Sequence, residues 1–308
     1  MRLTWISGLL FLILFASTRF IDSQTGTPAP YHLNVAVDEV SLTFHAEDIH
    51  GLAITDLKPD ELRILDNDKP PHRIVLFESL KDLPIRAGIL MDTSQSMQQN
   101  AASDHAIAIE YAQRILRQQT DRAFVMRFGK QSTVLQSWTN NPTVLTAGID
   151  RVGEGFGGTT ALFDTLYATC RYQFGSQHVA SGNFILLFSD GEDDASYLTL
   201  KNAVDMCQHT NTAIYAFRAE QSPGSTTDGL RNLAELVRQT GGRLFHDDDS
   251  QSEIVDLRAI ESDLRNQYHL IYNPATLQHD GVFHRITLLG PDRVNRITVR
   301  SGYYAPSR

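Results

Sequence analysis

Apolar and polar residues alternate along the first part of the chain. From His32 to Phe44 an apolar residue stands at nearly every second position, which is the pattern of strands with one buried face. The stretch GLAITDLKPDELRILDNDKPPHRIVLFE continues with short strands, separated by the polar turn DNDKPP. Residues 28–79 are therefore predicted to form an N-terminal antiparallel β segment.

From Ile85 onward, strands alternate with helices. The runs IRAGILM and NFILLFS are continuously apolar, which is typical of strands that are covered on both faces. Between and after them lie amphipathic stretches, such as the one that places Ile109, Ala112 and Ile115 at helical spacing. This alternation predicts an α/β domain over residues 83–273, a doubly wound and mostly parallel sheet with helices on both faces.

The last part of the chain returns to strands. QYHLIYNP, HRITLLG and RITVRSGYYA are strand-like segments that are separated by turns and not by helices. Residues 274–306 are therefore predicted to form a C-terminal β segment. Neither flank is long enough to bury a core alone, so we expect the two flanks to pair into one β-sandwich around the inserted α/β domain.

The first residues have a different character. Arg2 precedes the apolar run from Trp5 to Ala16, which is shorter than the about 20 residues that a bilayer span needs. This is the pattern of a secretory signal peptide, assigned to residues 1–23, with an uncleaved N-terminal anchor as the alternative. The prediction is an exported protein, periplasmic or extracellular, with no membrane span in the mature chain.

Charge and cysteine content restrict the classes of partner. A net charge of −9 argues against a broad nucleic-acid surface, and the absence of a G-x-x-x-x-G-K-[ST] phosphate loop argues against nucleotide binding. The two cysteines, Cys170 and Cys207, could form a disulfide in an oxidising compartment or stay as two buried thiols. The sequence leaves these two alternatives open.

Polar side chains gather where the two buried strands end. Asp92 ends the first run and alternates with Ser94 and Ser96 in MDTSQSM, while Asp190 follows the second run in FSDGEDD. Ligands of open parallel sheets bind beyond the carboxyl ends of the strands. The Gly-rich loop GFGGTTALFD lies between these segments and adds threonine hydroxyls. Carboxylates and hydroxyls without thiolate or imidazole are the ligands that Mg²⁺, Ca²⁺ or Mn²⁺ prefer.

Three segments together resemble a known family. DTSQSM, GGTTALFDTL and LLFSDGEDD resemble the metal-ion-dependent adhesion site of von Willebrand factor type A (VWA) domains, whose pattern is Asp-x-Ser-x-Ser, then Thr, then Asp. The flanking stretches resemble exported bacterial proteins with a VWFA-related domain, which are common in Acidobacteria. The resemblance implies a Rossmann-like VWA fold and a divalent cation, with Mg²⁺ expected first and Mn²⁺ or Ca²⁺ next.

The resemblance also implies a role for each motif residue. Ser94, Ser96 and Thr160 would coordinate the ion through their hydroxyls, and Asp92 and Asp190 would act directly or through water. Thr159 competes with Thr160; we prefer Thr160 because an apolar residue, a leucine, stands six positions after it, where the family's next helix has one.

The function expected from this site is binding rather than catalysis. A partner protein would complete the ion's coordination with an Asp or Glu carboxylate, which gives cation-dependent protein–protein interaction or adhesion. A structural subunit of an envelope assembly and a metal-assisted hydrolase are the alternatives. A Ser94–His105–Asp190 triad has no G-x-S-x-G motif to support it. Asp92 could also be only a helix N-cap, and the acids at 192–194 and 247–249 are expected to be solvated or to lie at helix N-termini.

Overall fold

The computed structural model describes residues 39–153, 157–175, 181–218, 227–246, 250–276 and 279–305. The predicted signal peptide (1–23), the start of the predicted N-terminal β segment and the acidic run 247–249 lie outside these residues. Within the described part of the chain, no helix is long and apolar enough to cross a membrane.

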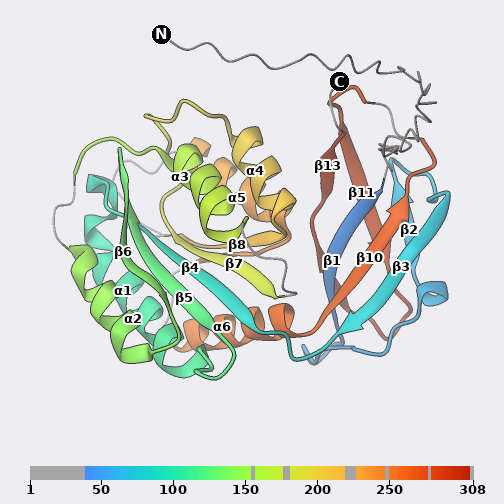
Figure 1. Cartoon of the computed structure of the whole chain (residues 1–308), viewed down its shortest axis with the longest axis horizontal. Coiled ribbons are helices and arrows are strands. Elements are labelled where there is room, and N and C mark those ends of the chain that lie inside the picture. Colours follow the sequence, from blue (N-terminus) through green and yellow to red (C-terminus); the bar gives the residue numbers. More distant parts are fainter. Residues whose placement is uncertain are drawn as a thin grey trace, which may run out of the picture. The chain divides into compact units, whose positions relative to one another are not determined.

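The α/β part is built on a six-stranded sheet with the order β6-β5-β4-β7-β8-β9 (Figure 1). Only the edge strand β6 is antiparallel to its neighbour; the other pairs are parallel. A mostly parallel sheet was predicted, and it is confirmed. The strands are β4 (Ile85–Asp92), β5 (Arg122–Phe128), β6 (Ser132–Thr139), β7 (Gly182–Phe188), β8 (Thr212–Arg218) and β9 (Leu244–His246).

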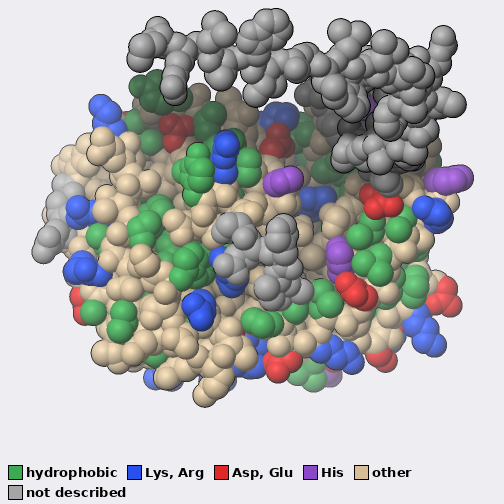
Figure 2. Space-filling model, viewed as in Figure 1, with side chains coloured by type: hydrophobic (Ala, Val, Ile, Leu, Met, Phe, Trp, Pro, Cys, Tyr) green, Lys and Arg blue, Asp and Glu red, His purple; other side chains and the backbone are tan. Residues whose placement is uncertain are grey.

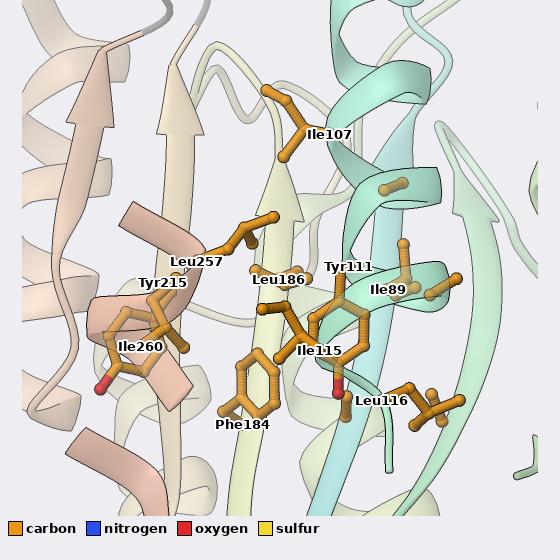
Figure 3. Packing of buried hydrophobic residues seen from close by; sticks show 14 of the residues in the cluster. Ile89, Ile107, Tyr111, Ile115, Leu116, Phe184, Leu186, Tyr215, Leu257 and Ile260 are labelled. Atoms are coloured by element: carbon orange, nitrogen blue, oxygen red, sulfur yellow. The ribbon is translucent and has the colours of Figure 1, made fainter. Parts of the chain in front are cut away.

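Helices cover both faces of this sheet. One core cluster joins the sheet to α1 (Ala101–Glu110), α2 (Pro142–Ile149) and α6 (Ser250–Arg265). The opposite cluster joins it to α3 (Leu162–Thr169), α4 (Leu200–His209) and α5 (Thr227–Thr240). In Figure 3, Ile107 comes from α1 and Tyr111 from the π-helical turn that follows it, and the ring of Tyr111 packs edge-on against Phe184 of β7. The central strands are therefore buried on both sides, which explains their continuous apolar runs.

The β-rich flanks form two antiparallel sheets, with the orders β12-β1-β10-β3 and β13-β11-β2. Strands from before and after the α/β part pair within the same sheets, and apolar residues of both sheets form one shared core. The fold class is thus as predicted. The strands are β1 (Val40–Glu47), β2 (Arg63–Asp66), β3 (Arg73–Leu80), β10 (Gln267–Asn273), β11 (Phe283–Leu289), β12 (Arg296–Val299) and β13 (Gly302–Tyr304).

Strand β10 lies inside the range 83–273 that the sequence assigned to the α/β domain, yet it pairs with β1 and β3. Only Asn266 separates it from α6, so no loop signals the change of domain. Its alternating burial, with Tyr268, Leu270 and Tyr272 inside, is that of a sandwich strand.

The two cysteines form a disulfide, which decides between the two alternatives that the sequence left open. Cys170 follows α3 and Cys207 lies on α4, and their Cα atoms are 5.0 Å apart. Both are fully buried between the helices of one layer.

Candidate metal centre

The site lies where two neighbouring strands end together. β4 and β7 are parallel, with Met91 opposite Phe188, so Asp92 and the residues after Phe188 reach the same edge of the sheet. The chain continues from β4 to β5 on one side, whereas β7 flanks β4 on the other. This is a topological switch point, the position at which open α/β sheets bind their ligands.

The loop after β4 is folded around the carboxylate of Asp92. Its Oδ1 accepts a hydrogen bond from the main-chain N–H of Ser94 (2.8 Å), and its Oδ2 accepts one from the hydroxyl of Ser189 (2.8 Å). The hydroxyl oxygens of Ser94 and Ser96 lie 3.1 Å apart. Asn100, and not Asp92, stands at the N-cap position of α1. Interpreting Asp92 as only a helix cap was therefore wrong; it shapes the loop that presents both serines.

The glycine-rich loop brings Thr160 to this edge. The side chain of Thr160 is buried and that of Thr159 is exposed. The main-chain N–H of Thr160 donates to Oδ1 of Asp194 (2.6 Å), and its carbonyl accepts from Asp194 and Ala195 (3.0 Å each). Gly157, with φ +146°, donates its N–H to the carbonyl of Thr93, which joins this loop to the first one.

The third loop carries Asp190, which is 1% exposed. Its Oδ1 accepts a hydrogen bond from the main-chain N–H of Glu192 (3.1 Å). Its Oδ2 is buried and accepts no hydrogen bond. Burying a carboxylate oxygen without a partner costs free energy, and such an orphaned acceptor in a native fold calls for a bound cation or donor.

The electrostatics of Asp92 and Asp190 also favour a bound cation. Burial raises the pKa of Asp92 to about 6; the nearby charge of Asp190 also raises it, while hydrogen bonds from Ser94 and Ser189 lower it. Neither acid forms an ion pair with a Lys, Arg or His among the described residues. Two buried carboxylates, with the Ser94 and Ser96 hydroxyls on the Asp92 loop and Thr160 on the adjoining loop, offer oxygen ligands of the kind that fits a hard divalent cation.

Two residues that the sequence analysis did not assign to the site support the candidate ligands. Ser189 is fully buried, donates to Asp92 and accepts the main-chain N–H of Gly191 (3.1 Å). Asp194 holds Thr160, as described above. The sequence assigned Asp193 and Asp194 to solvated loops or helix N-termini. Asp193 does accept from the first turn of α3, at the N–H of Phe163 (3.2 Å), but Asp194 clamps the glycine-rich loop.

The alternative triad is not assembled. Nε2 of His105 on α1 donates to Oδ1 of Asp150, which directly follows α2, at 2.9 Å. Ser94 instead faces Ser96, and Asp190 lies at the end of β7. Among the described residues, no hydrogen bond therefore joins His105 to Ser94 or Asp190, as the triad would require.

Comparison with known proteins finds one matching family model. The model of the von Willebrand factor type A domain matches residues 88–192. No curated protein matches the chain. Among solved structures, the conserved hypothetical protein BatB from Bacteroides thetaiotaomicron is 13% identical with a TM-score of 0.47, over 57% of this chain and 97% of that one.

Two further structures are similar at the same level. Proximal thread matrix protein 1 from the mussel byssus, solved with a zinc-occupied MIDAS motif, is 14% identical with a TM-score of 0.47, over 62% of this chain. This chain spans half of that protein, as 50% of it is covered. A von Willebrand factor type A protein from Catenulispora acidiphila is 12% identical with a TM-score of 0.45, over 80% of this chain and 72% of that one.

All three TM-scores are below 0.5, so the assignment depends on the family match and on the topology of the molecule itself. The matched segment contains the second half of β4, all of β5 and β7, the helices between them and both strand-end acids. Residues 88–192 therefore match the model of the von Willebrand factor type A domain, and they lie in a mostly parallel α/β sheet.

Proposed function

We propose that this protein binds a divalent cation, Mg²⁺ first, at a metal-ion-dependent adhesion site and uses it to hold a partner protein. Ser94, Ser96 and Thr160 would ligate the ion through their hydroxyls, and Asp92 and Asp190 directly or through water. The observation that carries the proposal is the buried Oδ2 of Asp190, which has no hydrogen-bond partner beside a second buried carboxylate.

The charge balance of this site supports binding of an acidic side chain. Two acids only neutralise a divalent ion, and the three hydroxyls add no charge. The ion would therefore keep an attraction for one further oxygen ligand, such as an Asp or Glu of the partner. On the face of the molecule in Figure 2, Lys and Arg side chains are interspersed with Asp and Glu, and the chain's net charge is −9. Both features agree with a protein partner rather than a nucleic acid.

Two further parts of the proposal concern compartment and chemistry. We propose that the protein is exported, because the Cys170–Cys207 disulfide suits an oxidising compartment and residues 1–23 read as a signal peptide. We also propose that it is not an enzyme, since His105 pairs with Asp150 and no contact among the described residues joins it to Ser94 or Asp190. The alternative function is a structural subunit of an envelope assembly, in which the VWA domain serves as a scaffold.

The test is a thermal titration of the full chain with Mg²⁺ and Mn²⁺. A ligand that binds only the folded state raises the melting temperature by mass action, by the equivalent of about 2.7 kcal/mol at a hundredfold excess over Kd. The variant Ser96→Ala should lose most of this increase. The matched control is Ser132→Ala, an exposed serine on the edge strand β6, which should keep it.

Equal melting increases in wild type and Ser96→Ala would place the ion elsewhere and refute the proposed site. If metal binding depends on Ser96, a second experiment must distinguish metal-dependent partner binding from a scaffold role. For that, partner proteins captured with Mg²⁺ are tested again with EDTA and with Ser96→Ala. Partners that survive both treatments favour the scaffold role.

A further inference from the structure

A second cluster of ligating side chains lies away from the strand-end site, where β1 of the sandwich meets α6. His45 and Glu47 are on β1, and Asp263 is in the last turn of α6; all three are buried. One ligating atom from each lies within 4.8 Å of the other two. Among the described residues this is the one group of three or more His, Cys, Asp or Glu side chains with such spacing.

The imidazole of His45 lacks a partner on one side. Its Nδ1 lies 2.8 Å from the main-chain oxygen of Asn266, which can only accept, so Nδ1 must carry the proton. Its Nε2 is buried without a hydrogen bond, 3.3 Å from Oδ1 of Asp263. A neutral ring would then direct a lone pair at a carboxylate oxygen. Two acceptors at this distance require a positive species between them, either a proton on Nε2 or a metal ion.

The hydrogen bond at Nδ1 of His45 is of the kind that metal-binding histidines make. Such histidines usually donate their other ring N–H to a carbonyl or carboxylate, as His45 does to Asn266. A tetrahedral ion with bonds of about 2.0–2.1 Å separates adjacent ligand atoms by about 3.3–3.4 Å. The observed separation of His45 Nε2 and Asp263 Oδ1 is 3.3 Å. An imidazole with two carboxylates suits Zn²⁺ better than Mg²⁺, which prefers oxygen alone.

We propose that His45, Glu47 and Asp263 form a zinc-type site, with a fourth position left for water, that fastens β1 of the sandwich to α6 of the VWA domain. This site is independent of the strand-end site. It shares no residue with it, and its ligands are of a different chemical kind.

Two arginines compete with the ion. Nη2 of Arg243 lies 2.7 Å from Asp263 and 3.5 Å from Glu47, and Nη2 of Arg296 lies 2.7 Å from Glu47. The side chain of Arg243 is 16% exposed, so it has a route to solvent when the ion enters. Removing Arg243 should therefore strengthen zinc binding, whereas removing a ligand should weaken it. This opposite sign distinguishes a metal site from an ion-pair network.

The experiment uses the full chain with Ser96→Ala, so that the strand-end site is silenced. Zn²⁺ binding is measured by calorimetry, and Co²⁺ serves as a spectroscopic probe, because its visible absorption is strong in tetrahedral sites. We expect His45→Gln to weaken Zn²⁺ binding more than about tenfold and to abolish the Co²⁺ bands. Arg243→Gln should strengthen Zn²⁺ binding by at least severalfold. His269→Gln is the matched control, a β10 histidine beside Glu78 (3.1 Å), and should change nothing.

Glu47→Gln is a second ligand variant in case His45→Gln does not fold, because an amide can still accept from Arg296. The proposal is overturned if the Ser96→Ala protein does not bind Zn²⁺. It is also overturned if neither His45→Gln nor Glu47→Gln weakens Zn²⁺ binding. Binding that Arg243→Gln strengthens but His45→Gln leaves unchanged also overturns it, because the ion would then be held by the acids alone.

Discussion

At the residue scale, Asp190 is a buried acid whose proposed role is to bind the ion rather than to stabilise the fold. It is 1% exposed, has one oxygen without a hydrogen bond and raises the pKa of its neighbour Asp92. We predict that Asp190→Asn abolishes the Mg²⁺-dependent increase in melting temperature. The metal-free variant should be as stable as wild type within about 1 kcal/mol, since a repulsion is removed.

Asp194→Ala is the contrasting variant, because Asp194 holds the N–H of Thr160 at 2.6 Å. It should lower the metal-free stability by about 1–3 kcal/mol, the cost of losing a hydrogen bond to a charged group. Urea unfolding with EDTA measures both values. A loss of stability in Asp190→Asn as large as that in Asp194→Ala would mean that Asp190 is structural.

The difference between these two acids also shows how far the sequence predicts the site. Asp92 and Asp190 stand at the ends of recognisable strands, and the serines and Thr160 stand at motif spacing. Ser189 and Asp194 act by hydrogen bonds to residues 97 and 34 positions away in sequence. No local pattern encodes such a partner, so these supporting residues become visible only when the strands lie side by side.

At the element scale, the central strand β4 depends on a glycine. A Cβ on Gly88 would lie 2.7 and 2.9 Å from two ring atoms of Phe124 on the neighbouring strand β5. That ring cannot move aside easily, because Trp138 and Phe174 pack against it with centroids 4.7 and 6.0 Å away. We predict that Gly88→Ala destabilises the protein by about 1–3 kcal/mol, as overpacking of a core does.

Gly153→Ala serves as the control, since an added Cβ there meets no atom within 4 Å. Its unfolding free energy should stay within about 0.5 kcal/mol of wild type. Chemical unfolding of the three proteins compares these values. Equal stabilities for both variants would show that β4 and β5 separate more readily than their packing implies.

The elements themselves were largely predictable, and their ends were not. Continuous apolar runs identified β4 and β7 because both faces of those strands are covered. The helix pattern through Ile109, Ala112 and Ile115 was real, but the α-helix ends at Glu110 and continues as a π-helical turn over Tyr111–Ile115. Apolar spacing does not distinguish these two helix types over one turn, so the change is invisible in the pattern.

At the scale of the whole molecule, the hydrophobic pattern predicted that β segments flank an α/β part. It did not predict the contacts that join the two ends of that part. The two β flanks share sheets and a core, as their short lengths led us to expect. The chain enters the α/β part near Leu83 and leaves it at Arg265, and these points are tied together by charge. Arg265 donates to both oxygens of Asp121 (2.6 and 3.1 Å) and to the carbonyl of Leu83 (3.2 Å). Residues 144 positions apart give no local sign of such a pair.

Breaking this ion pair should destabilise the protein strongly. Both side chains are buried, and Asp121 also accepts the N–H groups of Ile85 and Arg117 (2.9 Å each). Asp121→Asn should destabilise the protein by about 3–5 kcal/mol, because it leaves the Arg265 guanidinium buried without its counter-charge. Adding Arg265→Met to this variant should recover part of that loss, since no unpaired charge then remains. Asp68→Asn is the control: it breaks the exposed pair with Arg285 and should cost less than about 1 kcal/mol.

The pH dependence of stability follows from the same pair. Burial alone would raise the pKa of Asp121, but the hydrogen bonds from Arg265, Ile85 and Arg117 outweigh it, so the pKa lies below its ordinary value. A carboxyl whose pKa is lower in the folded state than in the unfolded state, where it is about 3.9, stabilises the fold. This stabilisation is fully present above the unfolded-state pKa and is lost as the pH falls through the folded-state pKa. Wild type should therefore lose stability on acidification below about pH 4 more steeply than Asp121→Asn does. Parallel losses in the two proteins, measured by urea unfolding from pH 7 to 3, would show that the pair at Arg265 does not hold the ends of the domain together.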